Sequence, residues 1–197
     1  MKVVIVGGVA GGATAAARIR RLNEQAEIVV FERSGYISYA NCGLPYYIGG
    51  VIEDPEDLTL QTPESFFSRF RIHMKVHHEV TAIHPDSKTV SVKNLETGEI
   101  FEESYDKLLL SPGAKPVWPN LPGMNSDKLF TLRTVEDTFR IKEFVDQQRP
   151  KSAVMVGGGF IGLEVAENLR ELGMEVTIVQ RPKQLMNPFD ADMASFI

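Results

Sequence analysis

The chain has 197 residues, a length that allows one large or two small globular domains, and 43% of its residues are hydrophobic. Its formal net charge of −5 argues against nucleic acid and anionic membrane surfaces as partners. The single cysteine, Cys42, excludes an internal disulphide, and no apolar run has the length of a membrane span. Met1 and Lys2 lead directly into an apolar segment without a signal-peptide pattern, so we expect a cytoplasmic protein that binds neither nucleic acid nor membranes.

An internal repeat predicts two dinucleotide-binding units. In the first copy an apolar run precedes a glycine-rich turn and a helix that ends at Leu22, and a second apolar strand follows at 28–31. In the second copy the same order leads to a helix that ends at Leu172 and a strand at 176–179. This strand–turn–helix–strand order predicts an α/β protein with two Rossmann-like, doubly wound units.

The segment between the repeats predicts a small antiparallel β insertion, with strands at 80–84, 89–93 and 100–104. The apolar run 108–110 then returns to the parallel sheet, and a proline-rich crossing follows. Two further helices are expected: one starts after Thr62 with Phe66, Phe67 and Phe70 on its apolar side, and one is capped by Thr134 and Asp137 and ends near Gln148.

These elements predict a first domain at 1–115, a connecting loop and helix at 116–150 and a second domain at 151–197. The second domain would hold one βαβ half and part of a following helix, so it is incomplete. We therefore expect the chain to be the N-terminal part of a longer protein.

The second glycine-rich turn carries a full dinucleotide fingerprint, with Gly157, Gly159 and Gly162 at GxGxxG spacing between a strand and a helix. These glycines permit a tight turn, a close approach to a pyrophosphate and packing of the helix on the sheet. Gln180 ends the next strand where a carboxylate commonly binds the ribose, and Arg181 follows it. We expect NADPH to be tolerated alongside NADH, unless Arg181 is a surface arginine without a cofactor role.

The first glycine-rich turn departs from that pattern. Gly7 and Gly12 fit it, whereas Val9 replaces the middle glycine. Glu32 ends the second strand at the usual distance of about 20 residues, where a carboxylate can bind an adenosine ribose. The alternative for Glu32 is a solvated strand end.

Cys42 lies in the segment 38–45, SYANCGLP. Pro45 is favoured in the first turn of a helix, so we expect Cys42 at a helix N-terminus, where the dipole favours a reactive thiolate. A buried, unreactive cysteine is the alternative. Thr14, Arg18 and Arg21 share one helix face and form either an anion site or a solvated basic face. The four histidines show no metal-ligand spacing, so no metal site is predicted.

These segments together resemble the single-cysteine branch of the pyridine nucleotide-disulphide oxidoreductases, with the closest likeness to coenzyme A-disulphide reductases. The resemblance covers the whole chain and is carried by residues 3–22, 31–33, 38–50, 105–116 and 156–169. It implies FAD at the first unit, NAD(P)H at the second, and a mixed disulphide between Cys42 and coenzyme A or a related low-molecular-weight disulphide or persulphide. It also implies a homodimer built through a C-terminal domain beyond this chain, and we expect the fragment alone to be inactive.

The resemblance assigns candidate roles residue by residue. The FAD candidates are Gly7, Gly8, Val9, Ala10, Gly11, Gly12, Glu32, Arg33, Val80 and Gly113. The candidates at the second unit are Gly157, Gly159, Phe160, Ile161, Gly162, Glu164, Gln180 and Arg181, where Phe160 matches an aromatic over the nicotinamide pocket and Glu164 an acid near the flavin. The coenzyme A candidates are Thr14, Arg18, Arg21, Ser38 and Asn41. Two alternatives stay open: an NADH oxidase or peroxidase with a sulphenic acid on Cys42, and a non-catalytic nucleotide-binding fragment.

Overall fold

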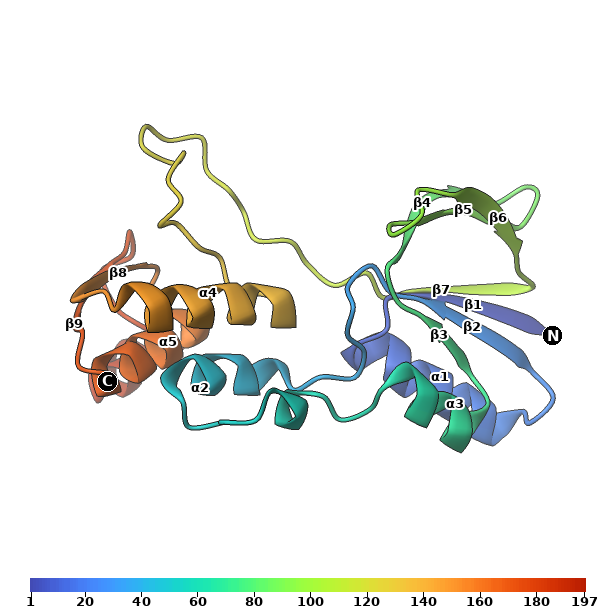
Figure 1. The fold of residues 1–197 in the computed structure, drawn as a ribbon, viewed down its shortest axis with the longest axis horizontal. Helices are drawn as coiled ribbons and strands as arrows, with labels where there is room; N and C mark the ends of the chain where they lie inside the picture. The colour runs from blue at the N-terminus through green and yellow to red at the C-terminus, as the bar shows by residue number, and fades with distance from the viewer. The chain divides into compact units, whose positions relative to one another are not determined.

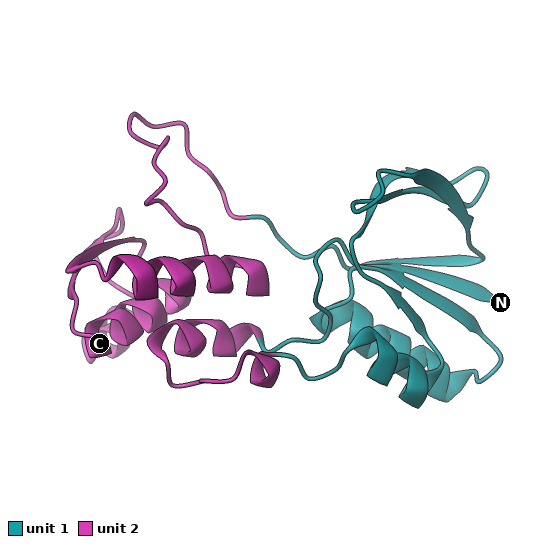
Figure 2. Ribbon diagram, in the orientation of Figure 1, with its two compact units in different colours: residues 1–40, 59–115 teal, residues 41–58, 116–197 magenta.

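The computed structural model describes residues 1–197 and divides them into two compact units (Figure 2). Unit 1 comprises Met1–Ala40 and Thr59–Lys115, and unit 2 comprises Asn41–Leu58 and Pro116–Ile197. The segment that carries Cys42 therefore belongs to the unit of the second fingerprint. The functional domain limits expected from the sequence stay a prediction.

Unit 1 is built on a parallel sheet with the strand order β3-β2-β1-β7. Helices α1 and α3 cover one face, and the antiparallel sheet β4-β5-β6 covers the other (Figure 1). The strands are β1 (Lys2–Val6), β2 (Glu27–Phe31), β3 (His73–Lys75), β4 (His78–His84), β5 (Thr89–Asn94), β6 (Ile100–Ser104) and β7 (Lys107–Leu110), and the helices are α1 (Ala10–Leu22) and α3 (Pro63–Phe70). The predicted α/β fold with an antiparallel insertion is confirmed; β3 was not predicted, because its three residues lack an apolar run.

The central strands of unit 1 are buried on both faces because successive side chains alternate across a sheet. On one face Ile5 and Ile28 pack with the small residues of α1 and with Phe66 of α3. On the other face Val4 and Phe31 pack against β5 and its neighbours. This double burial explains why these strands read as continuous apolar runs.

Helix α3 begins with a capping box between Thr62 and Ser65 and places Phe66 in the core, with Phe70 packed beside it. The expectation that Phe67 shares this apolar side is wrong: its side chain is 46% exposed and its ring lies against His73. Residues four apart lie on one helix face, whereas the next residue along is turned by about 100°.

Unit 2 combines a parallel strand pair, β8 (Ser152–Val156) and β9 (Glu175–Val179), with the helices α2 (Leu44–Gly49), α4 (Val135–Gln148), α5 (Phe160–Glu171) and α6 (Ala191–Ala194). Short 3₁₀ turns, η1 (Asn41–Gly43) and η2 (Pro55–Leu58), flank α2. The core joins Ile48 of α2 to apolar residues of α4 and α5. The predicted capping box of Thr134 and Asp137 and the predicted end of α4 are confirmed. No helix of the chain combines the length and apolar character that crossing a bilayer would require.

Candidate functional site

Close backbone contacts in the first glycine-rich turn leave no space for a side chain at Gly7 or Gly12. Gly7 has a φ of +98°, and a Cβ added there would lie 2.0 Å from the carbonyl oxygen of Ser111. A Cβ on Gly12 would lie 1.7 Å from the carbonyl oxygen of Gly7. Helix α1 begins at Ala10 after Val9, with no side-chain cap and no acidic residue in its first turn. The first N–H groups of α1 therefore suit an anionic group such as a pyrophosphate.

Glu32 follows β2 and folds back onto this turn. One carboxylate oxygen accepts a hydrogen bond from the Gly8 amide at 2.7 Å, and the other accepts bonds from the Ser34 amide and hydroxyl, each at 2.9 Å. A carboxylate offers about four lone-pair sites, so one remains for a ribose hydroxyl. Glu32 thus holds the glycine-rich turn in shape as well as ending the strand, which its spacing alone did not reveal.

Other FAD candidates follow neighbouring strands of the same parallel sheet. Gly113, with a φ of +71°, comes after β7, and Arg33 comes after β2. The carboxyl ends of parallel strands meet at one edge of a sheet. Gly113 and Arg33 therefore lie at the same edge of the sheet as the Gly7 turn, which follows β1. Arg33 is exposed and pairs with Glu79 at 3.6 Å. Val80 lies on β4, where the pairing with β5 shifts register. Its side chain packs against the core between the parallel sheet and the antiparallel sheet.

The second glycine-rich turn repeats this geometry in unit 2. Gly157 has a φ of +110°, and a Cβ on Gly162 would lie 2.1 Å from the carbonyl oxygen of Gly157. Gly159 precedes α5, and a Cβ added there would meet nothing within 4 Å. Helix α5 also starts without a side-chain cap or an acidic first turn. The second turn is therefore open where a pyrophosphate would approach the backbone.

The segment after β9 folds over Gly158. The Met186 amide donates to the Gly158 carbonyl oxygen at 2.8 Å, and the Gln180 side-chain amide donates to the carbonyl oxygen of Gln184. The Phe160 ring meets the edge of the Phe189 ring with centroids 5.9 Å apart.

The remaining candidates of the second unit lie on α5 or directly after β9. Arg181 is exposed, and Ile161 near the start of α5 is 53% exposed. Glu164 is half-buried, and its carbonyl oxygen accepts a bond from the side chain of Asn168.

Cys42 is exposed and lies in η1, directly before the helix α2. Pro45 occupies the first turn of that helix, as predicted, and the alternative of a buried cysteine is wrong. Asn41 accepts a hydrogen bond from the Arg133 guanidinium at 3.0 Å. At the other end of α2, a Cβ on Gly49 would lie 2.0 Å from the side-chain oxygen of Asn168, so α2 packs closely on α5.

A pocket of about 400 Å³ lies within unit 1, between α1, α3 and the segments 38–39 and 60–61. Thr14, Arg21 and Ser38 line it, as does Arg69 of α3. Arg18 is exposed and does not line this pocket, and Asn41 belongs to the other unit. Arg69 was not singled out from the sequence, because nothing local marks it as a neighbour of α1.

Arg20 is distinct from the exposed arginines of α1. Its guanidinium donates to the carbonyl oxygens of Phe70 and Arg71 at 2.8 and 3.0 Å, and to those of Asn23 and Glu24. It therefore joins the ends of α1 and α3, whereas Arg18 and Arg21 make no hydrogen bond or ion pair.

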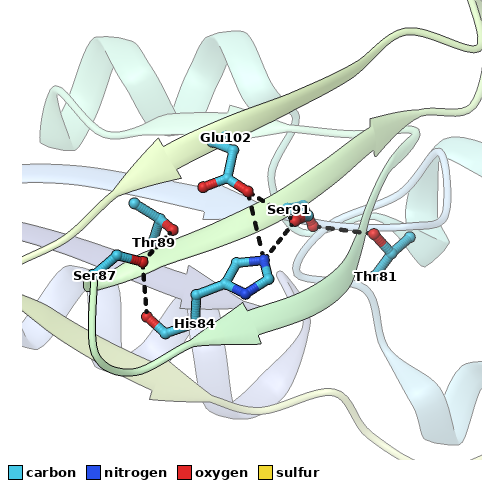
Figure 3. A network of polar contacts seen from close by, with 6 residues as sticks. All are labelled: Thr81, His84, Ser87, Thr89, Ser91 and Glu102. Atoms are coloured by element: carbon cyan, nitrogen blue, oxygen red, sulfur yellow. Dashed lines mark hydrogen bonds and ion pairs between the residues drawn. The ribbon is translucent and has the colours of Figure 1, made fainter.

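One polar cluster on the antiparallel sheet contains the residue types of a hydrolytic relay (Figure 3). His84 Nε2 lies 2.8 Å from the Ser91 hydroxyl and 3.4 Å from Glu102. A relay needs the acid and the nucleophile on opposite ring nitrogens, whereas here both face the same one. Hydrogen bonding from the Thr89 hydroxyl, with a smaller effect of Ser91, lowers the pKa of the exposed Glu102. The cluster links strands and offers no activated nucleophile. No group of three or more His, Cys, Asp or Glu residues is arranged to hold a metal ion.

The fold and these sites define a protein with two units of the dinucleotide-binding type and an exposed thiol in the compact unit that carries the second glycine-rich turn. The sequence profile of the family described as "Pyridine nucleotide-disulphide oxidoreductase" matches residues 1–197. The chain is 47% identical over 196 residues to the coenzyme A disulfide reductase of Staphylococcus haemolyticus (strain JCSC1435), covering 100% of the chain and 44% of that relative.

Two solved structures are similar along the whole chain. Reduced Bacillus anthracis CoADR-RHD shares 53% identity with a TM-score of 0.97, over 99% of this chain and 35% of that one. The NAD-dependent persulfide reductase from A. fulgidus shares 35% identity with a TM-score of 0.93, over 100% of this chain and 36% of that one.

The chain belongs to the pyridine nucleotide-disulphide oxidoreductase family. Members of this family are flavin-dependent oxidoreductases that use FAD and NAD(P)H. The chain spans 44% of the length of the curated relative that it matches.

Proposed function

We propose that this chain is part of an FAD-dependent NAD(P)H:disulphide oxidoreductase that reduces coenzyme A disulphide, or a related persulphide, at Cys42. The observation that carries the proposal is the exposed Cys42 directly before α2, in a chain without a second cysteine that could resolve it internally. Because residues 1–197 hold no other cysteine, this thiol is suited to a mixed disulphide with an external sulphur.

The cofactors fit the two turns. The Gly7–Gly12 turn and Glu32 would hold FAD, and the Gly157–Gly162 turn would hold NAD(P)H, because both turns lead into helices that start without a side-chain cap or an acidic first turn. FAD, when bound, supplies two-electron transfer between the nicotinamide and the disulphide. Arg33, Val80 and Gly113 complete the proposed flavin site, and Phe160, Ile161, Glu164, Gln180 and Arg181 complete the proposed nicotinamide site.

The thiol chemistry follows from Cys42 alone. Its thiolate attacks one sulphur of the disulphide, a bond forms between the two sulphurs, and the other half leaves as a thiolate that takes a proton from water. Two electrons from NAD(P)H, with a proton, then break the mixed disulphide, release the second thiol and restore the Cys42 thiolate.

The pocket of unit 1 supports a phosphate-bearing disulphide. Arg21 and Arg69 bring two cations to a pocket that Thr14 and Ser38 also line. Guanidinium groups bind phosphates through paired hydrogen bonds, so this lining suits the phosphates of coenzyme A.

A Cys42→Ser variant of the FAD-loaded protein tests the proposal. We expect NAD(P)H to reduce the flavin in the variant as in the wild type, while the reduction of coenzyme A disulphide, followed by thiol release, is abolished. An Arg21→Ala and Arg69→Ala double variant should raise KM for coenzyme A disulphide about tenfold or more, since each charged hydrogen bond contributes about 1.5–3 kcal/mol. It should leave KM for 2-hydroxyethyl disulphide unchanged, because that substrate has no phosphate. Wild-type turnover of coenzyme A disulphide by the Cys42→Ser variant would refute the proposal.

The oxidase or peroxidase alternative uses the same thiol as a sulphenic acid. The two cationic residues in the pocket favour the disulphide, because oxygen and peroxide carry no phosphate for them to bind. Peroxide-dependent NADH oxidation by the wild type that exceeds its reduction of coenzyme A disulphide would favour the alternative.

A further inference from the structure

Arg133 connects the start of α4 to the residue before the reactive thiol. Its guanidinium donates to the side-chain oxygen of Asn41 at 3.0 Å, although 92 positions separate the two residues. Both side chains are half-buried, and both belong to unit 2. Because Asn41 immediately precedes Cys42 in the turn η1, this bond acts on the neighbourhood of the thiol.

The bond fixes which way the Asn41 amide points. A guanidinium has donors only, so the Asn41 atom that faces it is the oxygen, and the NH₂ group occupies the other branch of the amide. That NH₂ group makes no hydrogen bond within the chain. No buried side-chain nitrogen or oxygen lacks a partner, so the NH₂ group reaches solvent. Asn41 therefore offers two free donors to a ligand.

Arg133 is itself held by the first turn of α4. Its backbone amide donates to the Asp137 carboxylate at 3.1 Å, and the same carboxylate accepts from the Thr134 amide at 3.2 Å. Val135 and Thr138 in the same turn are fully buried. The guanidinium is thus presented from an anchored helix start, which limits the conformational entropy lost when it holds Asn41.

We propose that Arg133 is a positioning residue that acts through Asn41: it orients the Asn41 amide so that its NH₂ group donates to an acceptor of the disulphide substrate near the reacting sulphur. The inference rests on the proposed reaction at Cys42 and deepens it, because it names the substrate class. Preferred disulphides carry a hydrogen-bond acceptor, such as an amide carbonyl, a few bonds from the sulphur.

The test measures thiol–disulphide exchange at Cys42 without NAD(P)H, so it does not depend on turnover. The protein is mixed with N,N′-diacetylcystamine, which has amide carbonyls, or with diethyl disulphide, which has no acceptor. In each case the Cys42 thiolate forms the mixed disulphide and releases one thiolate, and intact-mass spectrometry follows the rate. We expect Arg133→Met to lower the ratio of the two rates about fivefold to tenfold, which corresponds to one hydrogen bond of about 1–1.4 kcal/mol.

Two further variants keep the test decisive if Arg133→Met does not fold. Arg133→Lys retains a cationic donor, so its ratio of the two exchange rates should lie between those of Arg133→Met and the wild type. Asn41→Asp can still pair with Arg133, but its side chain has acceptors only. It should therefore lower the ratio of the two exchange rates as much as Arg133→Met does. A general effect on the nucleophilicity of the thiol slows both exchanges and cancels in the ratio.

Arg140→Met is the control, since Arg140 lies on α4, the helix that follows Arg133, pairs with Asp137 at 3.4 Å and lies over the Phe130 ring without a bond to Asn41; its ratio should equal that of the wild type. An unchanged ratio of the two exchange rates in Arg133→Met would overturn the inference. If both exchanges were slowed equally, the role of Arg133 would be merely structural, which would overturn it as well. Failure of NAD(P)H-driven reduction of coenzyme A disulphide would instead count against the proposed function, and the exchange ratio would still decide the role of Arg133.

Discussion

Replacing Glu32 should destabilise the first glycine-rich turn even without a cofactor. Glu32→Ala removes the acceptor of the Gly8 amide, which is buried, and the acceptors of the Ser34 amide and hydroxyl. An orphaned buried donor costs about 1–3 kcal/mol, and each partly exposed bond contributes about 0.5–1.5 kcal/mol. Allowing for water at Ser34, we expect a loss of about 2–4 kcal/mol in the free energy of unfolding of unit 1.

The assay is urea denaturation of the apoprotein followed by far-UV circular dichroism, combined with amide exchange of the peptides that cover residues 2–31. Glu32→Gln should lose about half as much, because its oxygen can still accept from Gly8 while its NH₂ group opposes the Ser34 amide. Ser34→Ala is the control: it removes the bonds of the hydroxyl to Glu32 and Tyr36 but leaves the Gly8 and Ser34 amides bonded to Glu32, so it should cost less than Glu32→Ala.

Glu32→Ala should also weaken FAD binding about tenfold or more, measured by flavin fluorescence quenching, because a charged hydrogen bond contributes about 1.5–3 kcal/mol. Ser34→Ala should bind FAD as the wild type does. Wild-type stability and wild-type amide protection of the Glu32→Ala apoprotein would refute the assignment of Glu32 to the shape of the turn, whatever happens to the flavin.

Three further outcomes are expected. Arg181→Ala should raise KM for NADPH about tenfold and spare KM for NADH, as one lost charged hydrogen bond implies; equal effects on both cofactors would exclude contact with the 2′-phosphate. Gly49→Ala should lower the free energy of unfolding by about 1–3 kcal/mol, because the added methyl group overpacks against Asn168. This loss should exceed the gain of up to about 1 kcal/mol in helix propensity, and an unchanged melting temperature would contradict the packing. Hydrogen bonding to Glu103 raises the pKa of Lys2 above its ordinary value of 10.5, so its contribution is complete below that pH and is lost as pH rises through the folded pKa. Lys2→Met should therefore be less stable by about 0.5–1 kcal/mol at pH 8, and the difference should shrink at still higher pH; a constant difference in urea midpoint would exclude the ion pairs as its cause.

Local patterns sufficed to predict the nucleotide-binding framework. Both glycine-rich turns could be recognised from spacing, because a left-handed φ at Gly7 and Gly157 and the close approach of Gly12 and Gly162 are demands on single residues. The capping box at Thr134 is equally local. The strands that flank the first turn were evident from their apolar runs, since strands buried on both faces need no polar alternation. The repeat of these patterns indicated two dinucleotide-binding units, and the resemblance to the family came from these segments together with the cysteine segment 38–50.

The partners of the candidate site residues were decided by tertiary structure. Arg133 reaches Asn41 across 92 positions, and Arg69 comes to the pocket of Arg21 from a different helix. The sequence marked Asn41 and Arg21 through resemblance but gave no sign of these partners. A side chain far along the chain becomes a neighbour only when packing brings its helix into place, and no local spacing encodes that distance. The glycines follow from the geometry of one turn, whereas the partner of Asn41 and the neighbour of Arg21 follow from how helices pack within each unit.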